Sequence, residues 1–257
     1  MPLGYNASQI NVVDILLNEM KRRGITNTNL QSAILAVISK ESAFTKFKET
    51  CYQNTSNERI KLIFSRTRTL TDAQINALKK DCATFFNYVY FGAKYGNKLP
   101  DDGWRFVGRG YNGITGRGNY EMIGKQIGVD LIAHPELLEN PTIGAKACIQ
   151  SFLNGIKYGV QKGYIKNRYG INDPLNPTTP VLAAKMLFNI NAGWGNDTRA
   201  NYWLQNDGYQ KMMAKLPQFD LYAIAKSKEN PHNNTSMYAG SWLIGLMALG
   251  TFFFANR

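Results

Sequence analysis

The sequence contains few cysteines and histidines, the residues that form disulfide bonds and most often bind metals. Its 257 residues include three cysteines, Cys51, Cys82 and Cys148, and two histidines, His134 and His232. The cysteines are odd in number and lack metal-ligand spacing. We therefore expect neither a disulfide framework nor a zinc site, and no metal or other cofactor.

Acidic residues are also scarce, with 18 Asp and Glu against 30 Lys and Arg and a net charge of +12. This excess suggests a polyanionic partner, such as nucleic acid, anionic lipid or an anionic cell wall. The chain has no run of five basic residues and no named nucleic-acid motif. We therefore expect a wall or membrane partner and no nucleic acid. The N-terminus also lacks the order of a signal peptide, so export, if any, would use another route.

Hydrophobic residues make up 44% of the chain and follow a helical period ahead of Glu41. Leu30, Ile34, Val37 and Ile38 recur at the spacing of one helix face, and Glu41 is the next position on that face. The carboxyl group should therefore point inward. An apolar wall disfavours the anion, so Glu41 could hold a proton and act as a general acid.

A second carboxylate, Glu49, follows in a stretch rich in Lys and Thr that has no apolar period. We expect it in a loop, near water and ionised. Two carboxyl groups in contrasting environments are what glycosidic bond cleavage requires, because one protonates the leaving oxygen and the other activates water. The alternative is that these residues have no catalytic role, because a Glu near a helix end is usually a surface residue or part of a salt bridge.

Residues 92–118 form a loop-like stretch in which glycine alternates with arginine and aromatic residues. Glycine lets a backbone approach a ligand and aromatic faces stack on sugar rings, so the stretch could enclose a glycan. A tight hairpin would explain the same glycines without a ligand.

Several motifs occur in a specific order between about Ile10 and Leu216. They are Glu41-Ser42-Ala43-Phe44, Glu49 with Tyr52, Tyr95-Gly96-Asn97, Asp102-Gly103-Trp104-Arg105-Phe106, Gly108-Arg109-Gly110-Tyr111, Ile114-Thr115-Gly116-Arg117, Asn119-Tyr120, Gly128-Val129-Asp130-Leu131, Pro135-Glu136-Leu137-Leu138, Asn140-Pro141, and Ile190-Asn191-Ala192-Gly193-Trp194 with Arg199 and Tyr202. In this order the chain resembles the catalytic domain of glycoside hydrolase family 19, particularly its endolysin-like branch, which cuts peptidoglycan.

The resemblance implies a mainly α, lysozyme-like (α+β) fold and hydrolysis of a β-1,4 bond with inversion. It implies Glu41 as general acid and Glu49 as general base. It also implies a set of substrate-binding residues: Tyr52, Trp104, Arg109, Tyr111, Thr115, Arg117, Asn119, Tyr120, Asn191 and Arg199. Two positions depart from the family pattern, because Gly113 replaces the usual Gln and Ala192 replaces the first Gly of Asn-Gly-Gly.

The sequence predicts three segments. Residues 1–226 form the catalytic domain, residues 227–236 are a polar linker, and residues 237–257 form a hydrophobic C-terminal segment. Met237 to Ala255 contains no charged residue. As a helix it would span about 28 Å, near the hydrocarbon thickness of a bilayer, which predicts a membrane anchor. The alternative is a helix that packs on its own domain or on a partner.

The preferred function is hydrolysis of peptidoglycan glycan strands by a phage enzyme. We expect it either in a virion, in the virion membrane with other virion proteins, or at the host cell envelope. The alternatives are a lytic transglycosylase, a chitinase, and a non-catalytic wall-binding virion protein. Glu-Ser-x-Phe also occurs in lytic transglycosylases, but their usual Gly-Leu-Met-Gln segment is absent.

Overall fold

The structure, a computed structural model, describes residues 4–45, 48–192 and 208–229, and these fold mainly as helices. The prediction of a mainly α fold is confirmed. The described residues contain no β-strand, and pairing there is limited to isolated bridges such as Lys48 with Arg109 and Arg109 with Ile114. The elements are α1 (Ala7–Arg22), α2 (Thr28–Ser42), α3 (Asn57–Ile63), η1 (Ser65–Thr67), α4 (Asp72–Lys79), α5 (Cys82–Val89), η2 (Ala93–Tyr95), α6 (Asp102–Arg105), α7 (Arg117–Ile127), η3 (Pro135–Glu139), α8 (Pro141–Gln161), α9 (Tyr164–Tyr169), α10 (Pro180–Ala192) and α12 (Gly208–Glu229).

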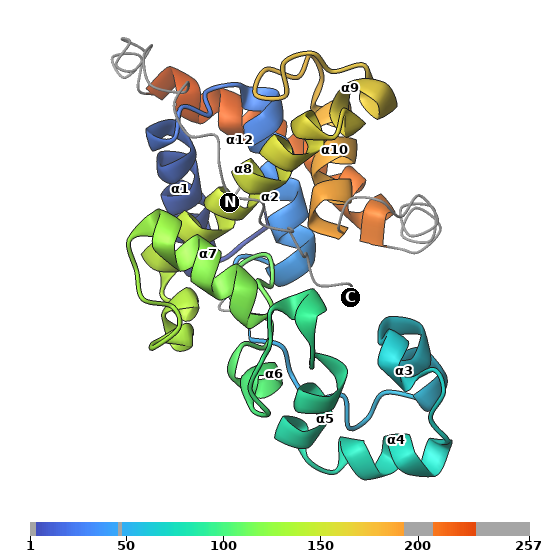
Figure 1. Ribbon diagram of the computed structural model, residues 1–257. Helices are drawn as coiled ribbons and strands as arrows, with labels where there is room; N and C mark the ends of the chain where they lie inside the picture. Colours follow the sequence, from blue (N-terminus) through green and yellow to red (C-terminus); the bar gives the residue numbers. More distant parts are fainter. Residues whose placement is uncertain (1–3, 46–47, 193–207, 230–257) are drawn as a thin grey trace.

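A larger group of helices, here called the upper lobe, consists of α1, α8, α9, α10 and α12 arranged around α2 (Figure 1). Helix α2 packs against α10 and α12, and α8 packs against α1 and α10. The small residues Ala145, Ala147, Ala183 and Ala184 predict close packing of α8 and α10, and all four are fully buried. Because α2 is covered on most sides, the unbroken apolar run from Ala33 to Ile38 is fully buried and stabilises the helix there.

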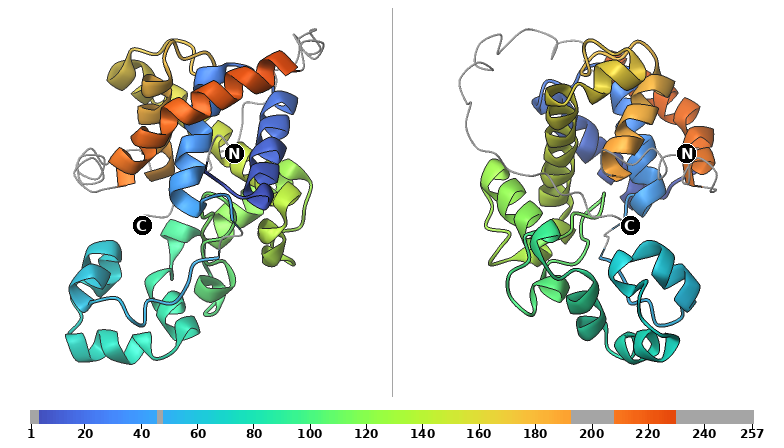
Figure 2. Two further views of the ribbon diagram at one scale, coloured as in Figure 1. Left: turned by 180° about the vertical axis from the view of Figure 1, so that it is seen from behind. Right: turned by 45° about the vertical axis from the view of Figure 1, so that its right-hand side comes forward.

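The smaller group, here called the lower lobe, contains α3, α4, α5 and α6 and lies on one side of the upper lobe in all three views (Figure 2). Its own core is built largely from aromatic side chains, including Phe64, Phe85, Phe86 and Tyr90. The sequence has an aromatic run of Phe85, Phe86, Tyr88, Tyr90 and Phe91, which is more typical of a core than of a ligand site. This prediction is confirmed at Phe85, Phe86 and Tyr90, whereas Tyr88 is half-buried and Phe91 is exposed.

Helix caps show how closely the local sequence sets the boundaries. The sequence predicts a helix that opens at Asn27-Thr28-Asn29 and an N-cap at Thr71, and both are confirmed: Asn27 caps α2, and Thr71 forms a capping box with Gln74 at the start of α4. The sequence also offers Ser8 as a cap for the first helix, and this prediction is wrong: Asn6 caps α1 and forms a capping box with Gln9, so α1 begins at Ala7.

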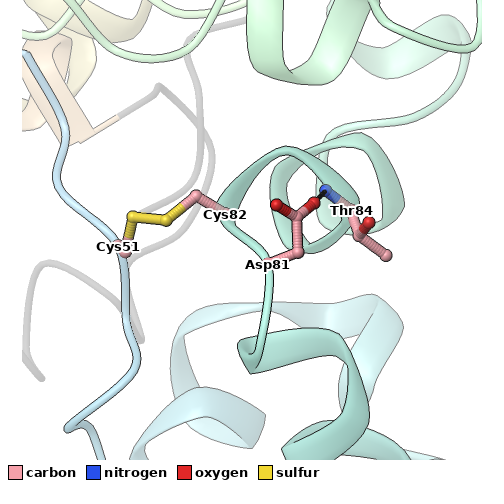
Figure 3. The surroundings of a disulfide bond; sticks show 4 residues. All are labelled: Cys51, Asp81, Cys82 and Thr84. Atoms are coloured by element: carbon pink, nitrogen blue, oxygen red, sulfur yellow. Dashed lines mark hydrogen bonds between the residues drawn. A yellow bond between two sulfur atoms is a disulfide. The ribbon is translucent and has the colours of Figure 1, made fainter.

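A disulfide bond joins Cys51 and Cys82 (Figure 3), with a Cα–Cα distance of 5.4 Å. The cysteine count argued against a disulfide framework, and it did not reveal this single bond. The two cysteines are 31 residues apart, and only the folding back of α3 and α4 brings them together. Cys148 is free and buried, and its burial raises the pKa of the thiol well above the ordinary value.

The structure bears on the predicted C-terminal linker only at its first residues. Helix α12 continues to Glu229, so residues 227–229, which were predicted to open the linker, are helical. No helix of the described ranges is long and apolar enough to cross a membrane. The rest of the linker and the hydrophobic segment 237–257 lie outside the described residues.

Candidate active site

Glu41 lies in the last turn of α2, at the end of the apolar face that the sequence predicted. Leu30, Ile34, Val37 and Ile38 on that face are fully buried. The Glu41 side chain is only 10% exposed, and its Oε1 accepts from the Lys40 ammonium at 2.8 Å. The Asn191 amide of α10 donates to the same oxygen at 2.9 Å. Both contacts fix the orientation of the carboxyl group.

The chain leaves α2 through two residues with left-handed backbone, Ala43 (φ 47°) and Phe44 (φ 60°). This conformation is unusual for residues other than glycine and costs on the order of 1 kcal/mol or more for each. The Phe44 side chain is fully buried and contacts the Tyr5 and Phe219 rings at 5.1 and 5.7 Å between centroids. This packing offsets the cost of the turn that directs the chain toward Glu49.

Glu49 is buried, with 5% of its surface exposed. The Tyr52 hydroxyl donates to Oε1 at 2.8 Å, and the Tyr90 hydroxyl lies 2.8 and 2.9 Å from the two carboxylate oxygens. The Gly108 amide also donates to Oε2, at 3.4 Å. The Glu49 backbone N–H is bound to the Gly108 carbonyl at 2.8 Å. Donors from three separate segments therefore hold one carboxylate.

The two environments differ, but in the opposite sense to the one expected. Glu49 was predicted near water and is instead enclosed, because α5 and the loop at Gly108 fold over it. Glu41 was predicted against an apolar wall and instead has the Lys40 ammonium beside it. The local sequence shows the period of α2, but it does not show which distant segments cover each carboxyl group.

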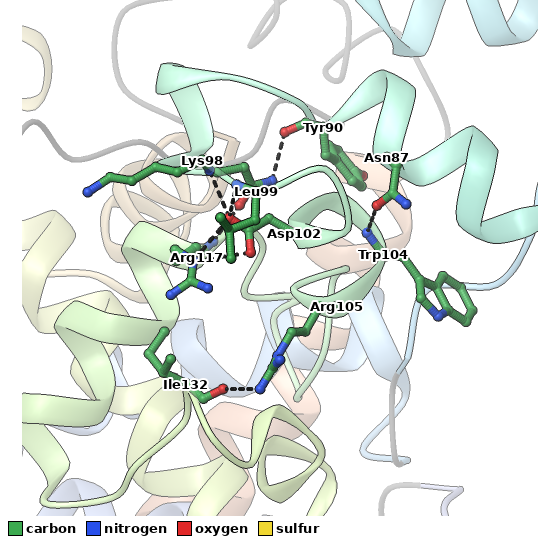
Figure 4. A network of polar contacts seen from close by, with 10 residues as sticks. Asn87, Tyr90, Lys98, Leu99, Asp102, Trp104, Arg105, Arg117 and Ile132 are labelled. Atoms are coloured by element: carbon green, nitrogen blue, oxygen red, sulfur yellow. Dashed lines mark hydrogen bonds and ion pairs between the residues drawn. The ribbon is translucent and has the colours of Figure 1, made fainter.

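The loop that leads into α7 is fixed by Asp102 and Arg117 (Figure 4). Arg117 Nε donates to both Asp102 oxygens, at 3.1 and 3.0 Å, and the backbone N–H groups of Lys98 and Leu99 donate to Oδ2. Asp102 is fully buried. Burial acts to raise the pKa of Asp102, but the hydrogen bonds from Arg117, Leu99 and Lys98 outweigh it and hold the pKa below its ordinary value. Arg117, expected to bind substrate, is thus an internal ion-pair partner.

Four further residues expected to contact the glycan are buried: Arg109, Tyr111, Thr115 and Tyr120. The Tyr120 hydroxyl donates to the Val107 carbonyl at 2.6 Å, and Arg109 Nη1 donates to the Arg105 carbonyl at 2.7 Å. Burial raises the pKa of Tyr111 to about 12. Side chains that are covered in this way support the loop, and their predicted role as substrate contacts stays a prediction.

The remaining expected contacts are more accessible. Tyr52, Trp104, Asn119 and Asn191 are all partly exposed. Tyr52 and Asn191 contact Glu49 and Glu41 respectively, so the fold brings each beside one carboxyl group. Asn119 donates to the Thr115 carbonyl at 2.9 Å. The motif residues 193–207, which include Arg199 and Tyr202, lie outside the described residues.

Gly113, which replaces the Gln of the family pattern, has φ 66°. This left-handed conformation favours glycine and would strain a glutamine, so the departure fits the local backbone. Gly116 has φ 89°, and a Cβ there would lie 2.5 Å from the Tyr95 carbonyl oxygen. The backbone conformation of the loop therefore accounts for Gly113 and Gly116.

Sequence reasoning missed two residues of the site, Tyr90 and Lys40. Tyr90 belongs to the aromatic run that we assigned to the core, and its ring is indeed in the core while its hydroxyl contacts Glu49. Lys40 directly precedes Glu41, and that adjacency was the available signal for an ion pair.

No protein family and no curated protein matches the chain. Two solved structures share 19% sequence identity with it. One is chitinase C from Streptomyces griseus, with a TM-score of 0.37, covering 85% of this chain and 71% of that chain. The other is a mutant of chitinase C, with a TM-score of 0.35, covering 78% of this chain and 74% of that chain.

Proposed function

We propose that the protein is a glycoside hydrolase that cleaves β-1,4 bonds of bacterial peptidoglycan with inversion at the anomeric carbon. The observation that carries the proposal is the pair Glu41 and Glu49, which lie at the two ends of the short connection between α2 and the lower lobe. Each carboxyl group is held by donors from other segments, so each has a defined orientation.

In this proposal Glu41 protonates the leaving oxygen and Glu49 accepts a proton from the attacking water. The Asn191 contact on Oε1 orients the Glu41 carboxyl group. The Lys40 ammonium on the same oxygen favours the carboxylate anion, so the assignment of Glu41 as the acid rests on the family resemblance and not on this contact. Tyr52, Tyr90 and Gly108 orient Glu49. The net charge of +12 favours an anionic wall over uncharged chitin. We further propose, from the sequence alone, that residues 237–257 anchor the enzyme in a membrane and that it acts in a phage virion or at the host envelope.

The test is mass analysis of the products from purified peptidoglycan, with chitin as a second substrate and Glu41→Gln as the inactive control. New reducing muramic acid or glucosamine ends, absent with the control, would support hydrolysis and identify the bond. Anhydro-muramic ends would replace the proposal with a lytic transglycosylase. Binding to the wall without any product would indicate a non-catalytic protein, and cleavage of chitin alone would indicate a chitinase.

A further inference from the structure

Lys48 occupies the position directly before Glu49 and is exposed, whereas Glu49 is buried. An isolated antiparallel bridge pairs Lys48 with Arg109, and the Glu49 amide is bound to Gly108 in the same pairing. Successive side chains of extended backbone point to opposite sides, which explains the contrast. The bridge therefore holds the Lys48 backbone at the surface, one residue before the proposed catalytic base, with the Lys48 side chain on the outer side of the segment.

The Lys48 ammonium lies 4.7 Å from the centre of the Trp104 ring. The Trp104 ring is stacked on Phe86, with 5.9 Å between centroids, so the aromatic core of the lower lobe holds it in place. A cation over an indole ring at an exposed site gains about 0.5–1 kcal/mol. This contact holds the otherwise flexible Lys48 side chain near the bridge.

Lys48 has no carboxylate partner among residues 4–45, 48–192 and 208–229. Lys40, the other lysine next to a proposed catalytic carboxyl group, is paired with Glu41. Lys48 thus presents a positive charge at the surface, next to Trp104 and one residue from Glu49, without a carboxylate counter-ion among the described residues. An anionic group on a substrate would supply that counter-ion.

We propose that Lys48 is a specificity-determining residue that binds a carboxylate carried by the glycan strand. This inference rests on the proposed function and deepens it. Peptidoglycan carries carboxylates, on its lactyl ethers where these are free and on its stem peptides, whereas chitin is uncharged. The ammonium group therefore favours peptidoglycan over chitin without any change in the two carboxyl groups that carry the reaction.

The test compares wild type and Lys48→Gln on native peptidoglycan and on peptidoglycan whose carboxylates have been converted to amides. Exposed ion pairs contribute about 0.2–1 kcal/mol, so Lys48→Gln should lose roughly 1.5- to 5-fold in kcat/KM on the native wall at low salt. The loss should lie in KM, because the contact is the same in substrate and transition state. On the amidated wall the two proteins should be equal, and 1 M salt should remove the difference. Lys48→Arg should restore activity on the native wall.

The matched control is Lys157→Gln, which removes the same charge from an exposed position on α8. Two further substrates show which carboxylate Lys48 binds. Peptidoglycan without stem peptides carries only the lactyl carboxylate, whereas intact peptidoglycan also carries the carboxylates of the stem peptides. An equal loss with Lys157→Gln, or an undiminished loss on amidated wall, would overturn the inference. Sedimentation with insoluble wall gives the same comparison as a binding measurement. If wild type cuts no wall, the proposed function fails, while the binding result still decides the role of Lys48.

Discussion

The double change Cys51→Ser and Cys82→Ser removes the disulfide bond. It should make the lower lobe open more often and disturb the hydrogen bonds that hold Glu49. Cys51 lies two residues after Glu49 and directly before Tyr52, and Cys82 is the first residue of α5. The bond therefore ties the segment that carries Glu49 to the helix that Tyr90 follows. Both tyrosines donate hydrogen bonds to Glu49.

The magnitude follows from the loop that the bond closes. For a sequence separation of 31 residues, the chain-entropy estimate is about 12 cal/mol/K, or ~3.7 kcal/mol at room temperature. A change of this size raises the equilibrium constant for opening of the lower lobe roughly 400-fold. The upper lobe has a separate core and should respond less.

Hydrogen exchange of backbone amides, followed by mass spectrometry, measures this opening directly. Peptides that cover α5 should exchange much faster in the double variant, whereas peptides that cover α2 should change little. A dithiol reductant should produce the same acceleration in wild type and none in the variant. Cys148 is buried, so it offers the reductant and alkylating reagents no competing site in the folded protein. Less than a threefold change at α5, or an equal change at α2, would refute the reasoning.

Glu41→Gln should lower wall cleavage about a hundredfold or more, since the amide cannot donate the proton; activity within threefold of the parent would remove Glu41 from the reaction. Glu49→Gln should be nearly inactive, and NMR of the first wild-type product should show inversion, so a retained anomer would require new roles for both groups. Arg117→Leu should destabilise the fold by about 3 kcal/mol in urea denaturation, because the buried Asp102 carboxylate would lose its charged partner and keep the Lys98 and Leu99 amides; a stable variant with weaker wall binding would support the substrate-contact role. The full chain should float with liposomes and a chain ending at Asn230 should not, although both cleave isolated wall; flotation of neither would end the anchor hypothesis.

Local chemistry in the sequence predicts several of the helices and their ends. The apolar period from Leu30 to Ile38 predicted a buried helix, although α2 is buried all round in this stretch and not on one face alone. Asn27 and Thr71 predicted helix starts, because a cap acts over three or four residues. The small residues Ala183 and Ala184 indicated close packing. The candidate carboxyl groups, Glu41 and Glu49, were also identified from the sequence.

The side chains that surround Glu41 and Glu49 are known only from the tertiary structure. Tyr90 reaches Glu49 across 41 residues and Asn191 reaches Glu41 across 150 residues. The Cys51–Cys82 bond joins segments 31 residues apart. Burial and hydrogen bonding depend on which distant segments pack over a side chain, and no local pattern records that packing. For this reason the sequence identified Glu49 but not its burial, and identified Arg117 but not its pairing with Asp102.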